Sequence, residues 1–323
     1  MAKTAAPVQV LVRGNTESPA EMVTPGGLSC SGHAVPDFGN DATPEGERRR
    51  LLAEWIVHPG NPLTARVLVN RLWHHHFGRG LVDTPSDFGR GGGKPSHPEL
   101  LDWLAGEFQR CGWSLKHMHR LLVISRAYQQ ESGTVQGASV DASNRLLWRM
   151  NPRRLDAESL RDAVLTASGC LNSDMGGPGY QDFTYQEAYA PIYRHVTADR
   201  PGLWRRSIYR FIVRTTPQRF LSTMDCPDPA NLTPARLTTT TALQALSLLN
   251  NEFMLQQAGH LAHRIERRAG MSSENRGRMA FELVLQRPPN GAELALALPV
   301  VEKDGLPQLC RLLLNANEFV LVD

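Results

Sequence analysis

The sequence predicts a mainly α fold: a multi-helical globular body with a minor β element and an extended N-terminal strap. Apolar residues recur at helical spacing through much of residues 45–168 and 238–315. Pro and Gly interrupt residues 1–44 at short intervals, which is typical of extended chain rather than regular structure. In the body, only Ser207–Val213 is clearly rich in β-branched and aromatic residues.

The elements divide the chain into four predicted segments. An extended strap or linker, in which Val8–Val12 is a short strand, precedes a helical lobe. An irregular insert that contains the Ser207–Val213 strand separates this lobe from a second helical lobe. In chain order, the predicted segments cover residues 1–44, 45–170, 171–237 and 238–323.

Capping residues predict where the helices of the first lobe begin. Ser96 followed three residues later by Glu99 has the pattern of a capping box, and Ser114 and Asp156 are predicted N-caps. Pro62 suits the first turn of a helix. The predicted helices cover residues 45–57, 63–77, 98–110, 114 to about 130, and 157–168.

Three features precede the second lobe: a Gly-rich loop, the predicted strand, and a short helical turn that covers residues 217–224. Thr238–Thr241 leads into one long helix that is predicted to continue to about Arg267, because leucines recur at helical spacing along it. Three shorter helices complete the chain, at residues 274–285, 291–301 and 306–315.

Charge and cysteine content exclude several classes of protein. The chain has 35 Lys and Arg against 32 Asp and Glu, and this +3 balance over 323 residues does not indicate a nucleic acid or an anionic membrane as a partner. No apolar run approaches the roughly 18 residues of a membrane span. The five cysteines form no C-x-x-C motif, so zinc ribbons, thioredoxin-like sites and covalent haem attachment are not indicated.

The densest polar chemistry lies in the helix predicted at residues 63–77. Arg66, Asn70 and His74 share one face, and Arg71 and His75 share the next. These groups must find partners on an otherwise apolar helix, either around a pocket for an anion or a metal, or in a hydrogen-bond network with neighbouring elements. The predicted pocket consists of Arg66, Asn70, Arg71, His75, His76, Asp83 and Asp87.

The sequence assigns no metal and no cofactor. Consecutive histidines point about 100° apart on a helix, so His74, His75 and His76 cannot all bind one ion. His260 and His263 lie on one helix face, but no third ligand accompanies them and nearby arginines disfavour a cation. No complete catalytic or nucleotide-binding motif is present.

Several long strings resemble one family. They include LTARVLVNRLWHHHFGRGLV at Leu63–Val82, GWSLKHMHRLLVISRAY at Gly112–Tyr128, NRLLWRMNPRRLDAESLRD at Asn144–Asp162 and TTTALQALSLLNN at Thr239–Asn251. With shorter matches near both ends, they resemble the planctomycete-type C-terminal domain of unknown function, number fifteen-fifty-three. The resemblance implies no catalytic residues. It implies a domain that usually ends a long exported protein, downstream of a cytochrome-c-like module.

Two hypotheses for function follow from the sequence. The first is a non-catalytic interaction or scaffold module of an exported redox or polysaccharide-handling protein, with cytochrome-c-like or other modules of the same system as partners. The alternative is a hydrolase acting on glycans or esters, with a His base, an orienting carboxylate and an Arg in the predicted pocket. Whether the protein is an enzyme therefore stays open at this point.

The N-terminus leaves two compartments open. Residues 1–14 contain one early Lys but lack the apolar core of about 7–15 residues that a secretory signal needs. The chain is expected to be cytoplasmic if it is complete, and periplasmic or extracytoplasmic if it is part of a longer exported protein.

Overall fold

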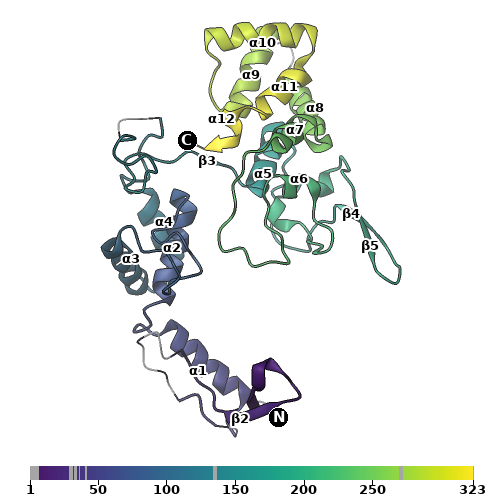
Figure 1. The fold of residues 1–323 in the computed structure, drawn as a ribbon. Coiled ribbons are helices and arrows are strands. Elements are labelled where there is room, and N and C mark those ends of the chain that lie inside the picture. The colour runs from purple at the N-terminus through teal and green to yellow at the C-terminus, as the bar shows by residue number, and fades with distance from the viewer. Residues whose placement is uncertain are drawn as a thin grey trace. The chain divides into compact units, whose positions relative to one another are not determined.

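The computed structural model describes residues 7–28, 32, 35, 37–40, 42–133, 137–268 and 272–322. Helices dominate these residues and the strands are few and short, so the predicted mainly α class is confirmed (Figure 1). The chain divides into two compact units, residues 1–151 and 152–323, called unit 1 and unit 2 below. The division into four segments stays a prediction. No described helix is both long and apolar enough to cross a bilayer.

Unit 1 begins with a hairpin and a polar helix. Strand β1 (Val8–Leu11) lies where the sequence predicts a strand, and it pairs antiparallel with β2 (Pro19–Val23). Helix α1 (Glu45–Val57) buries none of its residues. Its arginine run pairs with glutamates on the same helix, as expected of a solvated face.

The core of unit 1 lies between α2 (Thr64–Phe77), α3 (Pro98–Arg110) and α4 (Leu115–Val123). Phe77, Phe108 and Met118, one from each helix, are all at most 1% exposed. The predicted Ser114 cap is confirmed, because its hydroxyl accepts the backbone N–H of His117.

Two predictions for unit 1 are wrong, in each case because a serine has another partner. Ser96 does not cap α3: its backbone N–H and its hydroxyl both donate to the carbonyl of Leu81. Helix α4 ends at Val123 rather than near Gln130. The Ser125 hydroxyl donates to the Leu122 carbonyl and folds the chain into turns.

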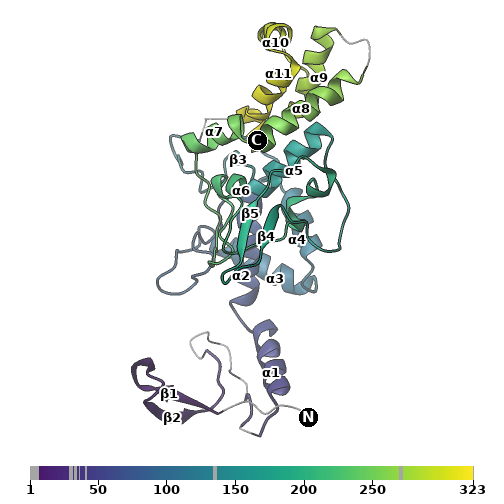
Figure 2. The same ribbon diagram turned by 90° about the vertical axis from the view of Figure 1, so that its right-hand side faces the viewer.

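Unit 2 is built on a helical core, which Figures 1 and 2 show with α9, α10 and α11 grouped together. Helix α8 packs on both α5 and α11, and Leu160, Leu261 and Leu314 from these three helices are completely buried. The predicted Asp156 cap of α5 is confirmed. The helices are α5 (Ala157–Ser168), α6 (Arg219–Thr223), α7 (Ala242–Asn250), α8 (Glu252–Glu266), α9 (Ser273–Leu285), α10 (Gly291–Lys303), α11 (Leu306–Leu314) and α12 (Asn317–Val320).

The prediction of one long helix from the Thr238–Thr241 segment to about Arg267 is wrong, because the helix is interrupted at Asn251 and forms α7 and α8 instead. Asn251 is extended, with φ −64° and ψ 137°, and its side chain accepts the backbone N–H of Phe253 as the N-cap of α8. A short polar side chain that bonds the local backbone competes with helix continuation.

The strand predicted at Ser207–Val213 is also wrong. Ser207–Tyr209 forms a 3₁₀ turn (η4), and beyond it only Arg210 makes a β-bridge, to Tyr180. The backbone N–H and the hydroxyl of Ser207 both donate to the Asp162 carboxylate on α5, which draws this segment onto a helix. Strands form elsewhere instead, pairing β3 (Arg153–Arg154) with β6 (Leu321–Val322) and β4 (Phe183–Gln186) with β5 (Ile192–His195).

Candidate functional site

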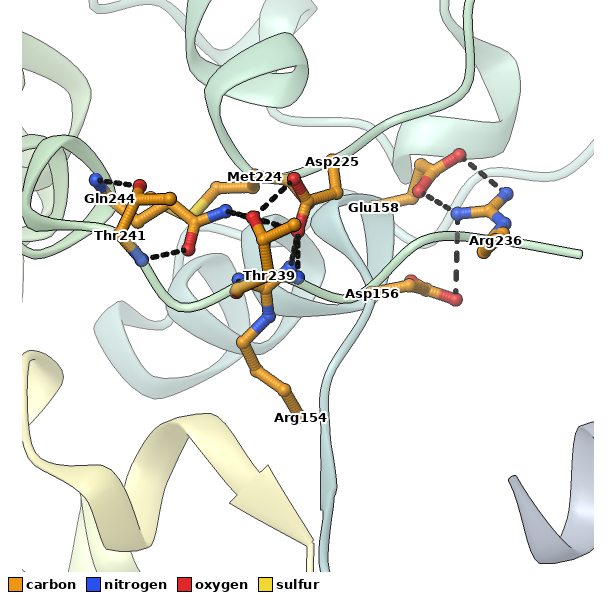
Figure 3. Close-up of polar contacts among 9 residues, drawn as sticks. All are labelled: Arg154, Asp156, Glu158, Met224, Asp225, Arg236, Thr239, Thr241 and Gln244. Atoms are coloured by element: carbon orange, nitrogen blue, oxygen red, sulfur yellow. Dashed lines mark hydrogen bonds and ion pairs between the residues drawn. The ribbon is translucent and has the colours of Figure 1, made fainter. Parts of the chain in front are cut away.

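Three segments of unit 2 that are distant in sequence meet in one polar network, drawn in Figure 3. Arg154 lies on β3 immediately before α5, and Asp225 follows the end of α6. Thr239 and Gln244 come from the loop before α7 and from its first turn. The network therefore joins one strand to the ends of two helices and the loop between them.

The Asp225 carboxylate is the centre of this network. It accepts hydrogen bonds from the Arg154 guanidinium at 2.6 Å, the Thr239 backbone N–H at 2.7 Å, the Thr239 hydroxyl at 2.9 Å and the Gln244 amide at 3.0 Å. Burial alone would raise the pKa of Asp225, but the bonds from Thr239, Arg154 and Gln244 outweigh it and lower the pKa. The carboxylate is therefore held ionised with its oxygens occupied.

A second ion pair lies beside the first. The Arg236 guanidinium bonds both carboxylate oxygens of Glu158, at 2.5 and 2.9 Å, in a bidentate arrangement (Figure 3). The Cys226 Sγ lies 3.6 Å from the same carboxylate. The two pairs fix the loop at residues 225–241 against the start of α5.

A cavity of about 80 Å³ opens next to Glu158 and Cys226. Its lining contains no histidine. The reactive groups that line it are the Cys226 thiol, the serine hydroxyls, the paired Glu158 carboxylate and the Arg210 guanidinium, whose Nε bonds the Asp182 carboxylate at 2.8 Å. The carboxylate of Glu158 is the one potential base among these lining residues, and Arg236 holds both of its oxygens. The lining residues are Glu158, Ser207, Arg210, Ile212, Val213, Pro217, Gln218, Leu221, Ser222, Cys226, Pro227 and Pro229.

The Cys226 thiol is expected to react slowly in the folded protein. Burial, and then the negative charge of Glu158, raise its pKa to about 11, so little thiolate is present at neutral pH. At pH 7.5, iodoacetamide should alkylate native Cys226 at least roughly tenfold more slowly than the urea-unfolded chain. Peptide mass spectrometry measures both rates, and equal rates would contradict this environment.

The seven residues of the predicted pocket lie in unit 1, and several have structural partners. Arg66 pairs with Asp102 of α3 at 2.7 Å. Asn70 is completely buried, and its side chain forms two hydrogen bonds with the backbone of Val82, at 2.8 and 2.9 Å. Arg66 and Asn70 therefore connect α2 to its neighbours.

The remaining predicted residues lie in different places. Arg71 and Asp87 line one open cavity, whereas Asp83 pairs with Arg79 and lines another. His76 Nε2 lies 2.8 Å from His119 Nδ1 on α4, and the His75 ring contacts that of His74. The structure thus brings Arg71 and Asp87 together and does not place the other five around their cavity. A binding role for these residues stays a prediction.

The described part of the structure gives no further indication of a metal site. The described residues contain no group of three His, Cys, Asp or Glu that could hold an ion. His260, a candidate ligand in the sequence, lies 2.8 Å from the carboxylate of Asp199 and against the Trp204 ring. Cys30, one of the five cysteines that form no C-x-x-C motif, lies outside the described residues.

Sequence reasoning missed the network of Figure 3. One signal was available, because Thr241 and Gln244 have capping-box spacing and do form a capping box at the start of α7. Nothing local marks Asp225 or Arg236, whose partners lie 71 and 78 residues away in the chain.

Comparison with known proteins identifies one family. The family described as PSD1, a protein of unknown function (DUF1553), matches residues 48–301. No curated protein and no solved structure matches the chain.

Proposed function

The chain belongs to the PSD1 family of unknown function (DUF1553), and from this premise we propose that it is a non-catalytic interaction module. Its proposed setting is an exported redox or polysaccharide-handling system, in which cytochrome-c-like modules are the partners. The resemblance of its long sequence strings to a domain found downstream of such modules supports this setting.

The observation that carries the proposal is a concentration of tyrosines on one hairpin. Of the six tyrosines in the chain, three lie within residues 183–195, at positions 185, 189 and 193. The hairpin formed by β4 and β5, residues 183–195, is called the Tyr arm here. It extends away from the helices of unit 2 in Figure 1. Tyr185 is 56% exposed, and Tyr189 is fully exposed at the tip. Tyrosine is enriched at protein interfaces because its ring gives contact area and its hydroxyl a hydrogen bond.

The Tyr arm is anchored at its base. His195 Nε2 lies 2.9 Å from the Thr216 carbonyl, and the backbone N–H of Val196 donates to the Asp182 carbonyl. The Asp182 carboxylate, in turn, holds the Arg210 guanidinium, and both side chains are about nine-tenths buried. A two-stranded hairpin alone is marginally stable in water, so these buried contacts keep the arm in place.

Exposed apolar residues continue the surface beside the arm. Phe211 lies against Phe183 with ring centroids 5.8 Å apart, and Ile208 and Ile212 are 75% and 57% exposed. Among the strands that the structure describes, β4 and β5 pair only with each other, so each also offers an unpaired strand edge. An aromatic arm with a free edge and an apolar neighbour is suited to docking another protein.

The polar network of Figure 3 also favours a binding role over turnover. Its carboxylates are occupied by arginine, threonine and glutamine donors, and the nearby Cys226 thiol is protonated at neutral pH. The hydrolase alternative finds no support in these contacts or in the family match. A network that fixes loops against a helical core makes the rigid platform that docking requires.

Replacing Tyr185 and Tyr189 together by Ser is expected to weaken binding of a cytochrome-c-like module by at least roughly tenfold, because exposed aromatic anchors carry much of an interface's energy. The probe is a purified module from a protein that also carries this family's domain, and isothermal titration calorimetry measures its affinity for this chain.

Leu296→Ser provides the matched control. Leu296 is 76% exposed on α10, outside the Tyr arm, and its replacement should leave affinity unchanged. Both variants should keep the wild-type melting temperature. The proposal fails if the wild-type chain does not bind the module, or if the tyrosine double variant binds as well as the wild type.

A further inference from the structure

A second cavity, of about 40 Å³, lies in unit 1 between α2, the segment before α3 and the turn at residues 143–147. Arg79, Lys94, His97 and Arg145 line it, together with one carboxylate, Asp83. This set of five residues is called the cationic pocket. The buried rings of Trp73 and Phe77, which stack with centroids 4.1 Å apart, form part of its wall. The pocket therefore combines a firm aromatic wall with an excess of positive charge.

The charges within the pocket do not balance. Asp83 is paired with Arg79 at 2.8 Å. Lys94 and Arg145 are exposed and make no ion pair or side-chain hydrogen bond within the described part of the chain. The Arg79 hydrogen bond lowers the pKa of Asp83, and the charge of Arg145 lowers it further. The positive charge of Arg145 is therefore felt at the Asp83 carboxylate inside the pocket. Backbone hydrogen bonds, and in addition the charge of Arg145, lower the pKa of Asp141, but that carboxylate does not line the pocket and makes no described ion pair with Arg145. Within the pocket, Lys94 and Arg145 remain for an anion from solution.

The N-terminus of α3 adds to the positive potential. His97 occupies the N-cap position, but no side chain caps this 13-residue helix. The Ser96 hydroxyl, which the sequence offered as the cap, is turned toward the Leu81 carbonyl and lies 2.9 Å from His97 Nδ1. Ser96 and His97 both line the pocket. The first residue of α3, Pro98, has no N–H, so the helix start contributes the positive end of its dipole rather than a backbone donor at that position.

The two unpaired cations project from braced backbone. Asn144, only 3% exposed, donates to the Arg149 carbonyl at 2.8 Å and fixes the turn that carries Arg145. A Cβ on Gly93 would lie 2.0 Å from Asp83 Oδ1, so the backbone preceding Lys94 packs directly on the Asp83 carboxylate. Binding an anion would therefore require ordering only the two long side chains.

From this arrangement we propose that the cationic pocket binds one tetrahedral oxyanion, a phosphate or sulfate group. The cavity has room for roughly three waters, which matches one such group rather than a polymer segment. Lys94 and Arg145 provide the charge and the hydrogen-bond donors, and Arg79 is shared with Asp83. This ligand site does not depend on the Tyr arm or on the proposed docking function.

Calorimetric titration of the full chain at low ionic strength tests the site. The ligands are inorganic phosphate, inorganic sulfate, glucose 6-phosphate and acetate. One phosphate or sulfate per chain should bind, with acetate at least roughly tenfold weaker. Tighter binding of glucose 6-phosphate than of inorganic phosphate would identify a phosphate ester as the source, and equal binding would identify the free anion. Acetate binding as tightly as phosphate would overturn the oxyanion assignment.

Charge variants make the test specific. Lys94→Gln and Arg145→Gln should each weaken phosphate binding roughly tenfold. Asp83→Asn should strengthen it several-fold, because it removes the internal anion that competes for Arg79. Lys116→Gln and Arg120→Gln, which remove exposed cations of α4 outside the pocket, should have no effect. The proposal is overturned if no phosphate binds, if the α4 variants weaken binding as much as the pocket variants, or if Asp83→Asn weakens it.

Discussion

Replacing Asp225 by Ala is expected to destabilise unit 2 by about 3 kcal/mol, because it leaves a mostly buried guanidinium without its counter-ion. The side chains of Arg154 and Asp225 are only 10% and 17% exposed. The substitution also removes the acceptor for the Thr239 backbone N–H and the Gln244 amide. For a unit of this size, the melting temperature should fall by roughly 6–12 °C, which differential scanning calorimetry measures.

The pH dependence of this effect has a defined sign. The folded-state pKa of Asp225 is lowered, so its ionised form stabilises the fold at pH values above its unfolded pKa of about 4. That contribution disappears as the pH falls through the lowered folded-state pKa. The difference in melting temperature between the wild type and Asp225→Asn should therefore be constant from pH 5 to 7 and shrink below about pH 4.

Asp174→Ala is the matched control for Asp225. Asp174 is exposed in the same unit, and among the described residues only its backbone forms hydrogen bonds, through its N–H to Asn172 Oδ1 and its carbonyl to Arg205. Its replacement should change the unfolding free energy by less than about 0.5 kcal/mol. If Asp225→Ala were as stable as Asp174→Ala, the network of Figure 3 would not hold the loop against α5.

The helices were predictable because their signals are local. Apolar spacing marks α2, and the caps at Ser114 and Asp156 need only a side chain and the backbone three residues later. Prediction failed where a distant partner decided the outcome. Ser96 has the right neighbours for a cap, but the carbonyl of Leu81, 15 residues earlier, takes its hydroxyl.

The candidate site was less predictable than the fold for the same reason. The sequence places Arg66, Asn70 and Arg71 on adjoining faces of α2, and that placement is correct. It does not show which element covers each face. Arg66 reaches Asp102 on α3, while Arg71 reaches toward Ser86 in the loop after the helix. Contacts between residues that are distant in sequence therefore separate groups that the helix pattern brings together.

Replacing Asn70 by Ala is expected to destabilise unit 1 by about 3 kcal/mol, the second large effect. Asn70 is completely buried, and its amide pairs with both the N–H and the carbonyl of Val82. Because Val82 is itself buried, the variant leaves two backbone groups without partners, each costing about 1–3 kcal/mol. Thermal unfolding monitored by circular dichroism should show a melting temperature lower by roughly 6–12 °C.

Arg71→Ala on the same helix separates this structural role from a general effect of removing a polar residue. Arg71 is exposed, and its hydrogen bond to Ser86 is long, at 3.4 Å, so its loss should cost less than about 0.5 kcal/mol. Asn70→Asp should be at least as destabilising as Asn70→Ala at neutral pH, because it buries a carboxylate without a counter-ion and turns one of its oxygens toward the Val82 carbonyl. Equal melting temperatures for Asn70→Ala and Arg71→Ala would show that the Val82 backbone finds other partners. The buried amide would then be free for the ligand-binding role that the sequence first suggested.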